Sequence, residues 1–417
     1  MEKKAFKPAD RLANVQEYYF SRKLKEVACL NAEGQDIISL AIGSPDMPPS
    51  QRTIDVLCDE ARKSNGHGYQ PTIGTPELRT AMAAFYRRWY HVDLDPQSEI
   101  QPLIGSKEGI LHVTLAFVNP GNQVLVPNPG YPTYTALSRL LGAEVVNYDL
   151  TEAGGWQPDF EQLEAMDLSR VKLMWTNYPH MPTGARARRE TYERLVAFAQ
   201  RHSIIIVNDN PYSFIRPHLS FRGTEESKAQ EETSTTGKDA PELLSILQMP
   251  GAKDCCIEFN SMSKSHNMPG WRVGMLATNA EFIRWILKVK TNIDSGTFRA
   301  MQLAAADALT NSSEEWHLQA NIHTYGSRRL IAEQIMEALG CTFDPEQTGM
   351  FLWGRISDSC PDVEDLTERV LHEARVFITP GFIFGSNGRR YIRISLCAKN
   401  EDMQEALRRI RQMTSEK

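Results

Sequence analysis

Between residues 100 and 290, the hydrophobic positions fall into short apolar runs separated by longer stretches of helical periodicity. Most of the runs are apolar without strict alternation, which is typical of strands buried on both faces of a parallel sheet. The six runs are NQVLVPN, AEVVNYD, VKLMWTN, SIIIVND, CCIEFNS and RVGMLAT. The pattern predicts an α/β fold with a mainly parallel sheet flanked by helices.

The pattern changes on both sides of this region, so we expect three parts. Residues 1–50 mix charged and aromatic positions and predict an N-terminal arm and the start of a small domain, with a strand-like run, IISLAIG, that ends at Gly43. Residues 51–295 form the predicted large domain. Residues 296–417 predict a linking helix and a smaller α+β domain. Within the large domain, residues 222–242 are charged and rich in Ser and Thr, which predicts a surface insertion.

Two longer helical stretches belong to these parts. The first, residues 51–90, is interrupted by NGHGYQPTIGTPELR, whose glycines and prolines predict a loop. The second runs over residues 281–338. Farther on, GMFLWGRI and RYIRISL indicate strands, whereas DVEDLTERVLHEA and EDMQEALRRIRQM indicate helices.

Composition narrows the function. With 46 basic and 52 acidic residues and a net charge of −6, the chain offers no basic face for nucleic acid or an acidic membrane. Its seven cysteines include no C-x-x-C pair, which argues against a disulfide framework and against a zinc site and favours a reducing compartment. No run approaches the roughly 20 apolar residues needed to span a bilayer. We therefore expect a cytoplasmic protein that acts on small molecules, with no metal and no nucleic-acid or membrane partner.

Polar residues capable of chemistry recur where the predicted strands end. VKLMWTN ends at Asn177, SIIIVND ends at Asp209 with Tyr212 three residues farther on, and CCIEFNS leads to Lys264. Open parallel sheets bind ligands at the carboxyl ends of their strands, so we expect these side chains at one edge of the sheet. Taken alone, each has an ordinary structural explanation, such as a solvated lysine or a helix-capping aspartate.

The segment SMSKSHNMPGWRVG resembles the S-x-S-K-x(5)-G-x-R-x-G signature of the fold-type I, class I/II aminotransferases, which use pyridoxal 5'-phosphate. The other pieces of that family's pattern occur in the same order: LAIGSPDMPP, YQPTIGTPELR, GSKEGI, NPGYPTY, NYPHMPTGA, NDNPY and RISL. The resemblance covers nearly the whole chain and is strongest to LL-diaminopimelate, alanine and aspartate aminotransferases. It implies the fold-type I architecture, the cofactor and a homodimer with shared active sites.

The resemblance also implies roles for the residues at the strand ends. Lys264 would carry the cofactor as a Schiff base, and its amine, once released, would move the Cα proton of the substrate. Asp209 would stabilise the protonated ring nitrogen. Tyr212 would donate a hydrogen bond to the ring hydroxyl oxygen, with Asn177 supporting the same side.

The remaining roles concern the phosphate, the ring face and the substrate. A phosphate dianion needs backbone N–H groups at a helix start, hydroxyls and a guanidinium. The resemblance implies that these come from Ser106, Lys107, Ser261, Ser263 and Arg272. It further implies that Tyr131 stacks on the ring, Tyr69 reaches the phosphate of the neighbouring subunit, Arg393 binds the substrate α-carboxylate and Gly43 belongs to a segment that closes over the substrate.

One position departs from the family pattern. Where the family usually has asparagine before P-T-G, this chain has Met181. The hydrogen bond of that asparagine to the ring hydroxyl must be missing or come from another group, such as His180 or Asn177. Losing one such bond costs about 1 kcal/mol, which does not remove the cofactor assignment.

Three functions are compatible with these residues. The leading one is a ping-pong transfer of an amino group between an α-amino acid and a 2-oxo acid, with a dicarboxylic or small neutral donor and 2-oxoglutarate as acceptor. Arg299 is a candidate partner for a distal carboxylate. An α,β-eliminating carbon–sulfur lyase would use the same residues, and an aminotransferase-like regulator without catalysis is the third alternative.

Overall fold

The computed structural model describes residues 6–14, 19–216, 243–317, 319 and 323–415. The predicted insertion at 222–242 lies outside the described residues. Within the described part of the chain, no helix is long and apolar enough to cross a membrane.

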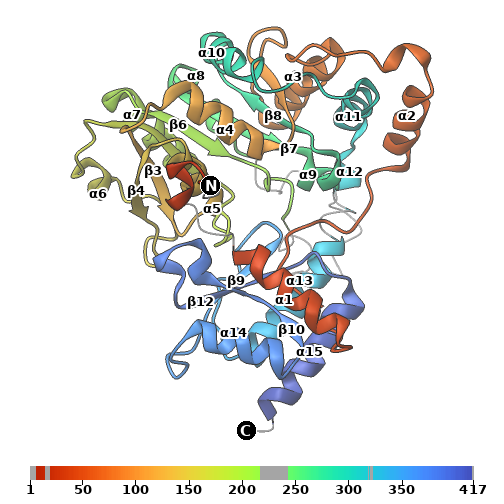
Figure 1. The fold of residues 1–417 in the computed structure, drawn as a ribbon, viewed down its shortest axis with the longest axis vertical. Helices are drawn as coiled ribbons and strands as arrows, with labels where there is room; N and C mark the ends of the chain where they lie inside the picture. Colours follow the sequence, from red (N-terminus) through yellow and green to blue (C-terminus); the bar gives the residue numbers. More distant parts are fainter. Residues whose placement is uncertain (1–5, 15–18, 217–242, 318, 320–322, 416–417) are drawn as a thin grey trace, which may run out of the picture.

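A seven-stranded, mostly parallel sheet forms the centre of the larger part of the molecule (Figure 1). Its strand order is β2-β8-β7-β6-β5-β3-β4, in which β4, β3, β5, β6 and β7 run parallel and β8 is antiparallel to both β7 and β2. The strands are β2 Ile100–Leu103, β3 Gln123–Asn128, β4 Glu144–Asp149, β5 Val171–Asn177, β6 Ile205–Asp209, β7 Cys256–Ser261 and β8 Gly274–Ala277. All six predicted runs form strands of this sheet, and the prediction of a mainly parallel α/β fold is confirmed.

The sequence pattern missed β2. This strand is only four residues long and contains Pro102, and proline usually argues against a strand interior. It lies at one edge of the sheet and pairs with β8 alone, which is where a strand tolerates proline.

Helices cover both faces of the sheet, which explains why its strands lack alternation. Successive residues of one strand belong to different apolar clusters: Val207 packs with α4 and α10, whereas Ile206 packs with α3 and α7. These helices and their neighbours are α3 Pro76–Tyr90, α4 Ser106–Phe117, α5 Pro132–Leu140, α6 Phe160–Glu164, α7 Arg189–His202, α8 Ala252–Cys255, α9 Met262–Ser265 and α10 Ala280–Lys290.

The smaller part of the molecule is mixed α and β (Figure 1). An antiparallel sheet has the order β11-β12-β9, and β1 pairs in parallel with β10. Its elements are α1 Tyr19–Ala32, β1 Ile38–Ser39, α13 Thr324–Ala338, β9 Phe351–Arg355, α14 Val363–His372, β10 Val376–Phe377, β11 Thr379–Pro380, β12 Tyr391–Ser395 and α15 Asn400–Ser415. The run IISLAIG therefore contributes only a two-residue strand, shorter than predicted.

The predicted helical stretch over residues 281–338 is divided into several helices. After α10, the chain turns through Gly296 before α11 Arg299–Asn311, followed by α12 Glu314–His317 and α13. α11 packs on α2 Gln51–Ala61 and α3, while α13 packs on α15. α10 already ends at Lys290, and farther on a Cβ on Gly296 would collide with the backbone of Gln70 and Pro71, so this close approach requires glycine. The boundary near residue 295 stays a prediction.

Short 3₁₀ turns complete the described part of the chain. They are η1 Asp10–Asn14, η2 Ser64–Gly66, η5 Ile246–Gln248, η6 Pro269–Trp271, η8 Gly381–Phe384 and η9 Ser386–Gly388.

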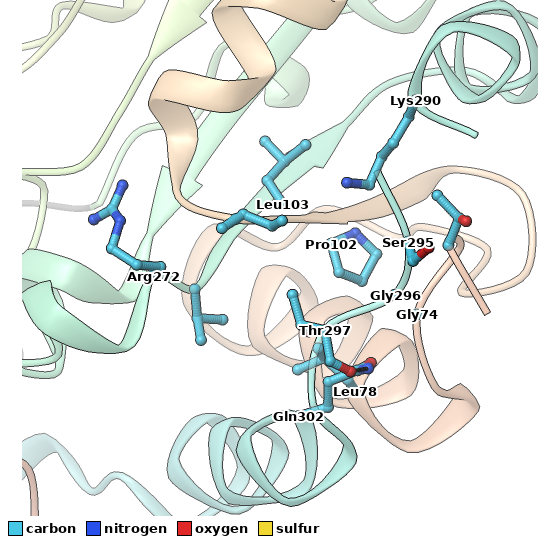
Figure 2. Close-up of a pocket in the computed structure, with 13 residues that line it drawn as sticks. Gly74, Leu78, Pro102, Leu103, Arg272, Lys290, Ser295, Gly296, Thr297 and Gln302 are labelled. Atoms are coloured by element: carbon cyan, nitrogen blue, oxygen red, sulfur yellow. Dashed lines mark hydrogen bonds between the residues drawn. The ribbon is translucent and has the colours of Figure 1, made fainter. Parts of the chain in front are cut away.

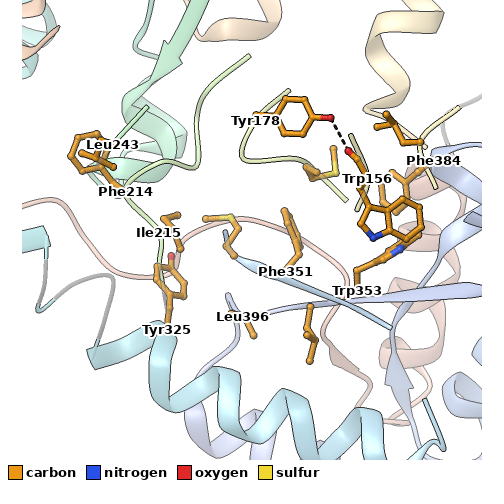
Figure 3. Packing of buried hydrophobic residues seen from close by; sticks show 14 of the residues in the cluster. Trp156, Tyr178, Phe214, Ile215, Leu243, Tyr325, Phe351, Trp353, Phe384 and Leu396 are labelled. Atoms are coloured by element: carbon orange, nitrogen blue, oxygen red, sulfur yellow. Dashed lines mark hydrogen bonds between the residues drawn. The ribbon is translucent and has the colours of Figure 1, made fainter. Parts of the chain in front are cut away.

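Aromatic side chains pack where the large sheet meets the smaller part (Figure 3). Trp353 of β9 stacks on Tyr391 at a ring-centroid distance of 5.0 Å, and Trp156 meets both rings edge-on. The hydroxyl of Tyr178 donates to the Trp156 carbonyl at 2.7 Å. Because these contacts are buried and mostly apolar, they hold the two parts of the chain against each other.

Leu173→Ala is expected to lower the free energy of unfolding by about 2–5 kcal/mol, since its side chain is fully buried in the middle of β5 and its removal leaves a cavity. Urea denaturation of the variant beside the unmodified protein measures the difference. Leu330→Ala is the matched control, because Leu330 is exposed on α13, and we expect a change below about 0.5 kcal/mol. Similar losses in both variants would contradict the described core.

Candidate active site

A cavity of about 420 Å³ lies at the carboxyl ends of β5, β6 and β7. The small domain closes one side of it through Phe351, Phe384 and Arg393. Twelve of the thirteen residues predicted for the site line this cavity: Gly43, Ser106, Lys107, Tyr131, Asn177, Asp209, Tyr212, Ser261, Ser263, Lys264, Arg272 and Arg393. The structure thus brings together residues that lie up to 350 positions apart (Gly43 and Arg393).

Lys264 lies directly beyond β7, on the short helix α9. The Ser261 side chain caps this helix by accepting a hydrogen bond from the Ser263 backbone N–H at 3.2 Å. Lys264 Nζ donates to the carbonyl oxygen of Gly43. Burial lowers the pKa of the Lys264 amine, and the nearby guanidinium groups of Arg393 and Arg272 lower it further. An amine that loses its proton more easily is a better nucleophile.

Asp209 is the last residue of β6, and its two carboxylate oxygens differ in their hydrogen bonding. Oδ2 accepts a hydrogen bond from the Tyr134 hydroxyl at 2.9 Å, and Tyr134 is itself held by stacking on Trp175 at 4.8 Å. Oδ1 is buried without a hydrogen-bond partner among the described residues. Burial raises the pKa of Asp209 to about 6. A buried, unsatisfied carboxylate oxygen is costly, so this group is suited to a cationic partner inside the cavity.

Asn177 has a supporting place in the wall of the cavity. Its Nδ2 donates to the Asp209 carbonyl, and its Oδ1 accepts from the Met181 backbone N–H at 2.8 Å. Both ends of the amide therefore position neighbouring backbone. Tyr212 also lines the cavity, and burial raises the pKa of its hydroxyl, so the hydroxyl keeps its proton and remains a donor.

The departure from the family pattern is visible in the cavity. Met181 lines it, whereas His180 does not and pairs instead with the Thr183 hydroxyl at 2.8 Å. The Met181 sulfur lies 3.3 Å from Nη1 of Arg393. His180 lies outside the cavity, whereas Asn177 lines it and has a second Nδ2–H beside the one donated to the Asp209 carbonyl.

The part of the cavity beside the start of α4 has groups that suit an anion. Gly105, with φ 74°, forms the N-cap of α4, so that Ser106 and Lys107 begin the helix with free backbone N–H groups. A Cβ on Gly105 would collide with the Arg272 guanidinium, and one on Gly274 would lie 2.8 Å from the Ser106 nitrogen. Both positions therefore require glycine, because the turn and the arginine approach each other so closely.

Arg393 lies on β12 and is 4% exposed. Its Nη2 donates to the Ala41 carbonyl at 2.8 Å. The guanidinium carbon is 3.9 Å from the ring centroid of Phe351 and 4.7 Å from that of Phe384. The two rings desolvate the guanidinium and fix its plane, which prepares it for bidentate contact with a carboxylate.

Two predicted residues lie elsewhere. Tyr69 is 96% exposed in the loop between α2 and α3 and does not line the cavity of its own chain. Arg299, the candidate partner for a distal carboxylate, is 3.5 Å from Glu77 and also lies outside the cavity.

The sequence patterns missed several residues that shape the site. Tyr134, the hydrogen-bond donor to Asp209, follows Tyr131 by three positions, and this helical spacing was the signal available for it. Phe20, Phe351 and Phe384 surround Arg393, and no spacing indicated them because they come from three separate elements.

Comparison with known proteins shows the family to which the chain belongs. Residues 35–410 match the family described as "Aminotransferase class I and II", and the chain belongs to this family. It is 39% identical to the LL-diaminopimelate aminotransferase of Moorella thermoacetica over 405 residues, covering 97% of this chain and 98% of that protein. It is 36% identical to the enzyme of the same name from Aquifex aeolicus over 408 residues, covering 98% and 99%.

Solved structures agree with the fold. Substrate-bound BacF from Bacillus subtilis superposes with a TM-score of 0.86 at 31% identity, covering 99% of this chain and 98% of that one. An aminotransferase from Staphylococcus aureus gives a TM-score of 0.83 at 28% identity, covering 98% and 99%. The protein is an enzyme of the transaminase type that depends on pyridoxal phosphate.

Asp209→Asn is expected to stabilise the cofactor-free protein at neutral pH. The folded pKa of about 6 lies above the ordinary value of 3.8, so the folded state binds this proton more tightly than the unfolded chain does. The carboxylate therefore lowers stability above pH 6, and this effect disappears as the pH falls below 3.8.

We expect the substitution to raise the free energy of unfolding by about 2–3 kcal/mol at pH 7 and to change it little at pH 3. Urea denaturation of the stripped protein across this pH range measures it. Asp59→Asn, on an exposed side chain of α2, is the control and should have no effect at either pH. A difference between Asp209→Asn and the unmodified protein that does not depend on pH would contradict the raised pKa.

Proposed function

We propose that this aminotransferase holds pyridoxal phosphate through Lys264 and uses the released amine to move the substrate Cα proton during amino-group transfer to a 2-oxo acid. The observation that carries the proposal is one cavity that contains a buried lysine amine and the unpartnered Oδ1 of Asp209. When bound, the cofactor supplies an electron sink for the carbanion formed at the substrate Cα.

The walls of the cavity fit the two ends of such a cofactor. At the ring end, Asp209 Oδ1 would stabilise a protonated nitrogen, while Tyr212 would donate to the ring hydroxyl and Tyr131 would cover the ring face. Tyr131 lines the cavity and meets Tyr134 edge-on at 5.4 Å, an arrangement that keeps its ring in place.

The phosphate end would be held by backbone N–H groups and side chains around the start of α4. Ser106 and Lys107 begin that helix, and Ser261, Ser263 and Arg272 line the same part of the cavity. Arg272 Nη1 lies 3.5 Å from the Ser263 hydroxyl and 3.1 Å from the Pro269 carbonyl, so its guanidinium is oriented before a ligand binds. Helix N-termini favour anions through their free N–H groups and dipole.

The substrate carboxylate would lie against Arg393, and the proton would travel through Lys264. The Lys264 amine, once released, would accept the Cα proton of the substrate, a role that its lowered pKa supports. Gly43 and Ala41 lie between these two side chains, because their carbonyl oxygens accept hydrogen bonds from Lys264 and Arg393 respectively. Phe20, Phe351 and Phe384 keep this part of the cavity apolar and exclude water.

We further propose a dicarboxylic amino acid of the LL-diaminopimelate type as donor and 2-oxoglutarate as acceptor. The support is the similarity to proteins named LL-diaminopimelate aminotransferase, at 35–39% identity over nearly the whole chain. A cytoplasmic location is proposed from the cysteine pattern alone.

A homodimer with shared sites is also part of the proposal. Tyr69 is exposed on its own chain, and exposed apolar side chains lie in the same region: Phe298, which stacks on His67 at 5.7 Å, and Ile293. Clustered exposed apolar side chains are typical of an interface, and in a dimer Tyr69 would reach the phosphate of the partner's cofactor.

The first experiment records the visible absorption spectrum of the purified protein during addition of single amino acids. LL-Diaminopimelate is expected to remove the band of the lysine-bound cofactor, and 2-oxoglutarate to restore it. Glutamate, aspartate, alanine and phenylalanine are tested in parallel. Lys264→Ala should lack the band and lose at least about 10³-fold in turnover. Lys288→Ala, on an exposed position of α10, is the matched control and should retain both.

A band that is removed by none of the donors would contradict the proposed substrate class. Release of pyruvate and ammonia would show that the protein is an α,β-eliminating lyase and would contradict transamination.

Mixing two inactive variants tests the shared site. In a hybrid of Lys264→Ala and Tyr69→Ala chains, one site carries both native residues if Tyr69 acts on the partner, so activity should return to about a quarter of the unmodified level. Subunits are exchanged by mild denaturation, and turnover is measured at a cofactor concentration that does not saturate Tyr69→Ala. The matched control pairs Lys264→Ala with Arg272→Ala, two residues of the same cavity, which should restore nothing. Equal recovery in both mixtures would exclude the role of Tyr69.

A further inference from the structure

A group of four polar and charged side chains, two buried and two partly exposed, lies near the start of α4 and outside the cavity described above. It consists of Glu108 and His112 of α4, Lys290 at the end of α10, and Asp294 in the loop that follows; we call it the Lys290 cluster. Lys290 Nζ lies 2.5 Å from Glu108 Oε1 and 2.7 Å from Asp294 Oδ1. The His112 ring nitrogens lie 3.3 Å from Glu108 and 3.5 Å from Asp294. Lys290 is 2% exposed and His112 is fully buried.

The Lys290 cluster is neutralised from within. Glu108, His112 and Asp294 are close enough together to be considered as metal ligands, but the Lys290 ammonium already contacts both carboxylates. Burial lowers the pKa of His112 to about 4, so the imidazole is neutral, and burial raises the pKa of Glu108 to about 7. Removing charged side chains from water costs free energy even when they are paired. We therefore expect this cluster to have a role beyond packing.

Glu108 connects the cluster to the turn at residues 104–106, which precedes and begins α4. The second carboxylate oxygen of Glu108, Oε2, accepts a hydrogen bond from the backbone N–H of Ile104. Ile104 directly precedes Gly105, the N-cap of α4, and Ser106 follows. Glu108 therefore holds the residue before the N-cap of α4 without itself lining the cavity.

Asp294 connects the cluster to the segment that carries Tyr69. The loop from Asp294 continues to Gly296, which pairs with Gln70 in an isolated β-bridge. Figure 2 shows Leu103 and Pro102 of β2 between Arg272 on one side and Lys290 and Ser295 on the other. A cavity of about 10 Å³ lies among these residues, which leaves room for about one water molecule.

We infer that the Lys290 cluster positions two segments of its chain together: the phosphate-binding turn of its own site and the Tyr69 segment, which would serve the partner's site. Each phosphate of the dimer is then recognised only when the turn of one chain and Tyr69 of the other are both aligned. Glu108, Lys290 and Asp294 are positioning residues, since none of them lines the active-site cavity. The inference rests on the proposed function, because it places the cofactor phosphate at the start of α4.

The test compares binding of pyridoxal phosphate and of pyridoxal, which lacks the phosphate, to the cofactor-free protein by absorbance titration. Glu108→Ala removes the bond to Ile104 and is expected to weaken pyridoxal phosphate binding about 10-fold, with pyridoxal binding changed less than about 2-fold. Glu108→Gln keeps an acceptor for the Ile104 N–H and should recover most of the affinity. Glu281→Ala, an exposed glutamate of α10, is the matched control and should change neither titration.

The link to Tyr69 is measured with a double-mutant cycle. Asp294→Ala and Tyr69→Phe are each expected to weaken pyridoxal phosphate binding, and the combined variant should lose less than the sum of the two. Thermal unfolding of every cofactor-free variant is recorded beside the titrations.

Three outcomes would overturn the inference. Equal weakening of both ligands by Glu108→Ala would assign the cluster to general stability. Additive effects of Asp294→Ala and Tyr69→Phe would remove the link between the two segments. An unmodified protein that binds pyridoxal as tightly as pyridoxal phosphate would overturn the proposed phosphate site as well, which separates that failure from the other two.

Discussion

The parallel register of β5, β6 and β7 is the constraint on which the rest of the structure depends. Asn177 pairs with Asp209, and Asp209 pairs with Phe259, so the three strands end at nearly the same level. β7 continues two residues farther and passes directly into the helix that carries Lys264. Strand hydrogen bonds therefore set the distance between the carboxylate and the amine, and side-chain rotamers adjust it only slightly.

Electrostatics gives the cavity two distinct ends. Asp209 is the carboxylate at one end, and Arg272 with the start of α4 is at the other, so a ligand with a cationic ring nitrogen and a phosphate has one favourable orientation. Burial acts on both titrating groups in the direction of the neutral form: it raises the pKa of Asp209 and lowers that of Lys264. Among the described residues Asp209 Oδ1 has no hydrogen-bond partner, and the Lys264 amine is held only by a neutral carbonyl, so both groups are suited to a bound cofactor.

The N-terminal segment connects β12 to Lys264. Ser395 of β12 donates its backbone N–H to Leu40 and its hydroxyl to Ile42, both at 2.8 Å. The next residue, Gly43, accepts from Lys264. Residues 40–43 therefore link β12, and Arg393 on it, to Lys264 through backbone carbonyl groups.

The sequence by itself determined the buried strands, the residues at their ends and the place of Arg272 eight positions after Lys264. These features are local: periodicity within a run, a polar residue after it, and a fixed spacing from Lys264. Tertiary structure alone decided the antiparallel edge of the sheet, the break of the helical run after Lys290 and the donor to Asp209. It also decided the Lys290 cluster, whose Lys290 and Glu108 are 182 positions apart. Such contacts depend on how elements from distant parts of the chain pack, and no pattern within a single window of sequence carries that information.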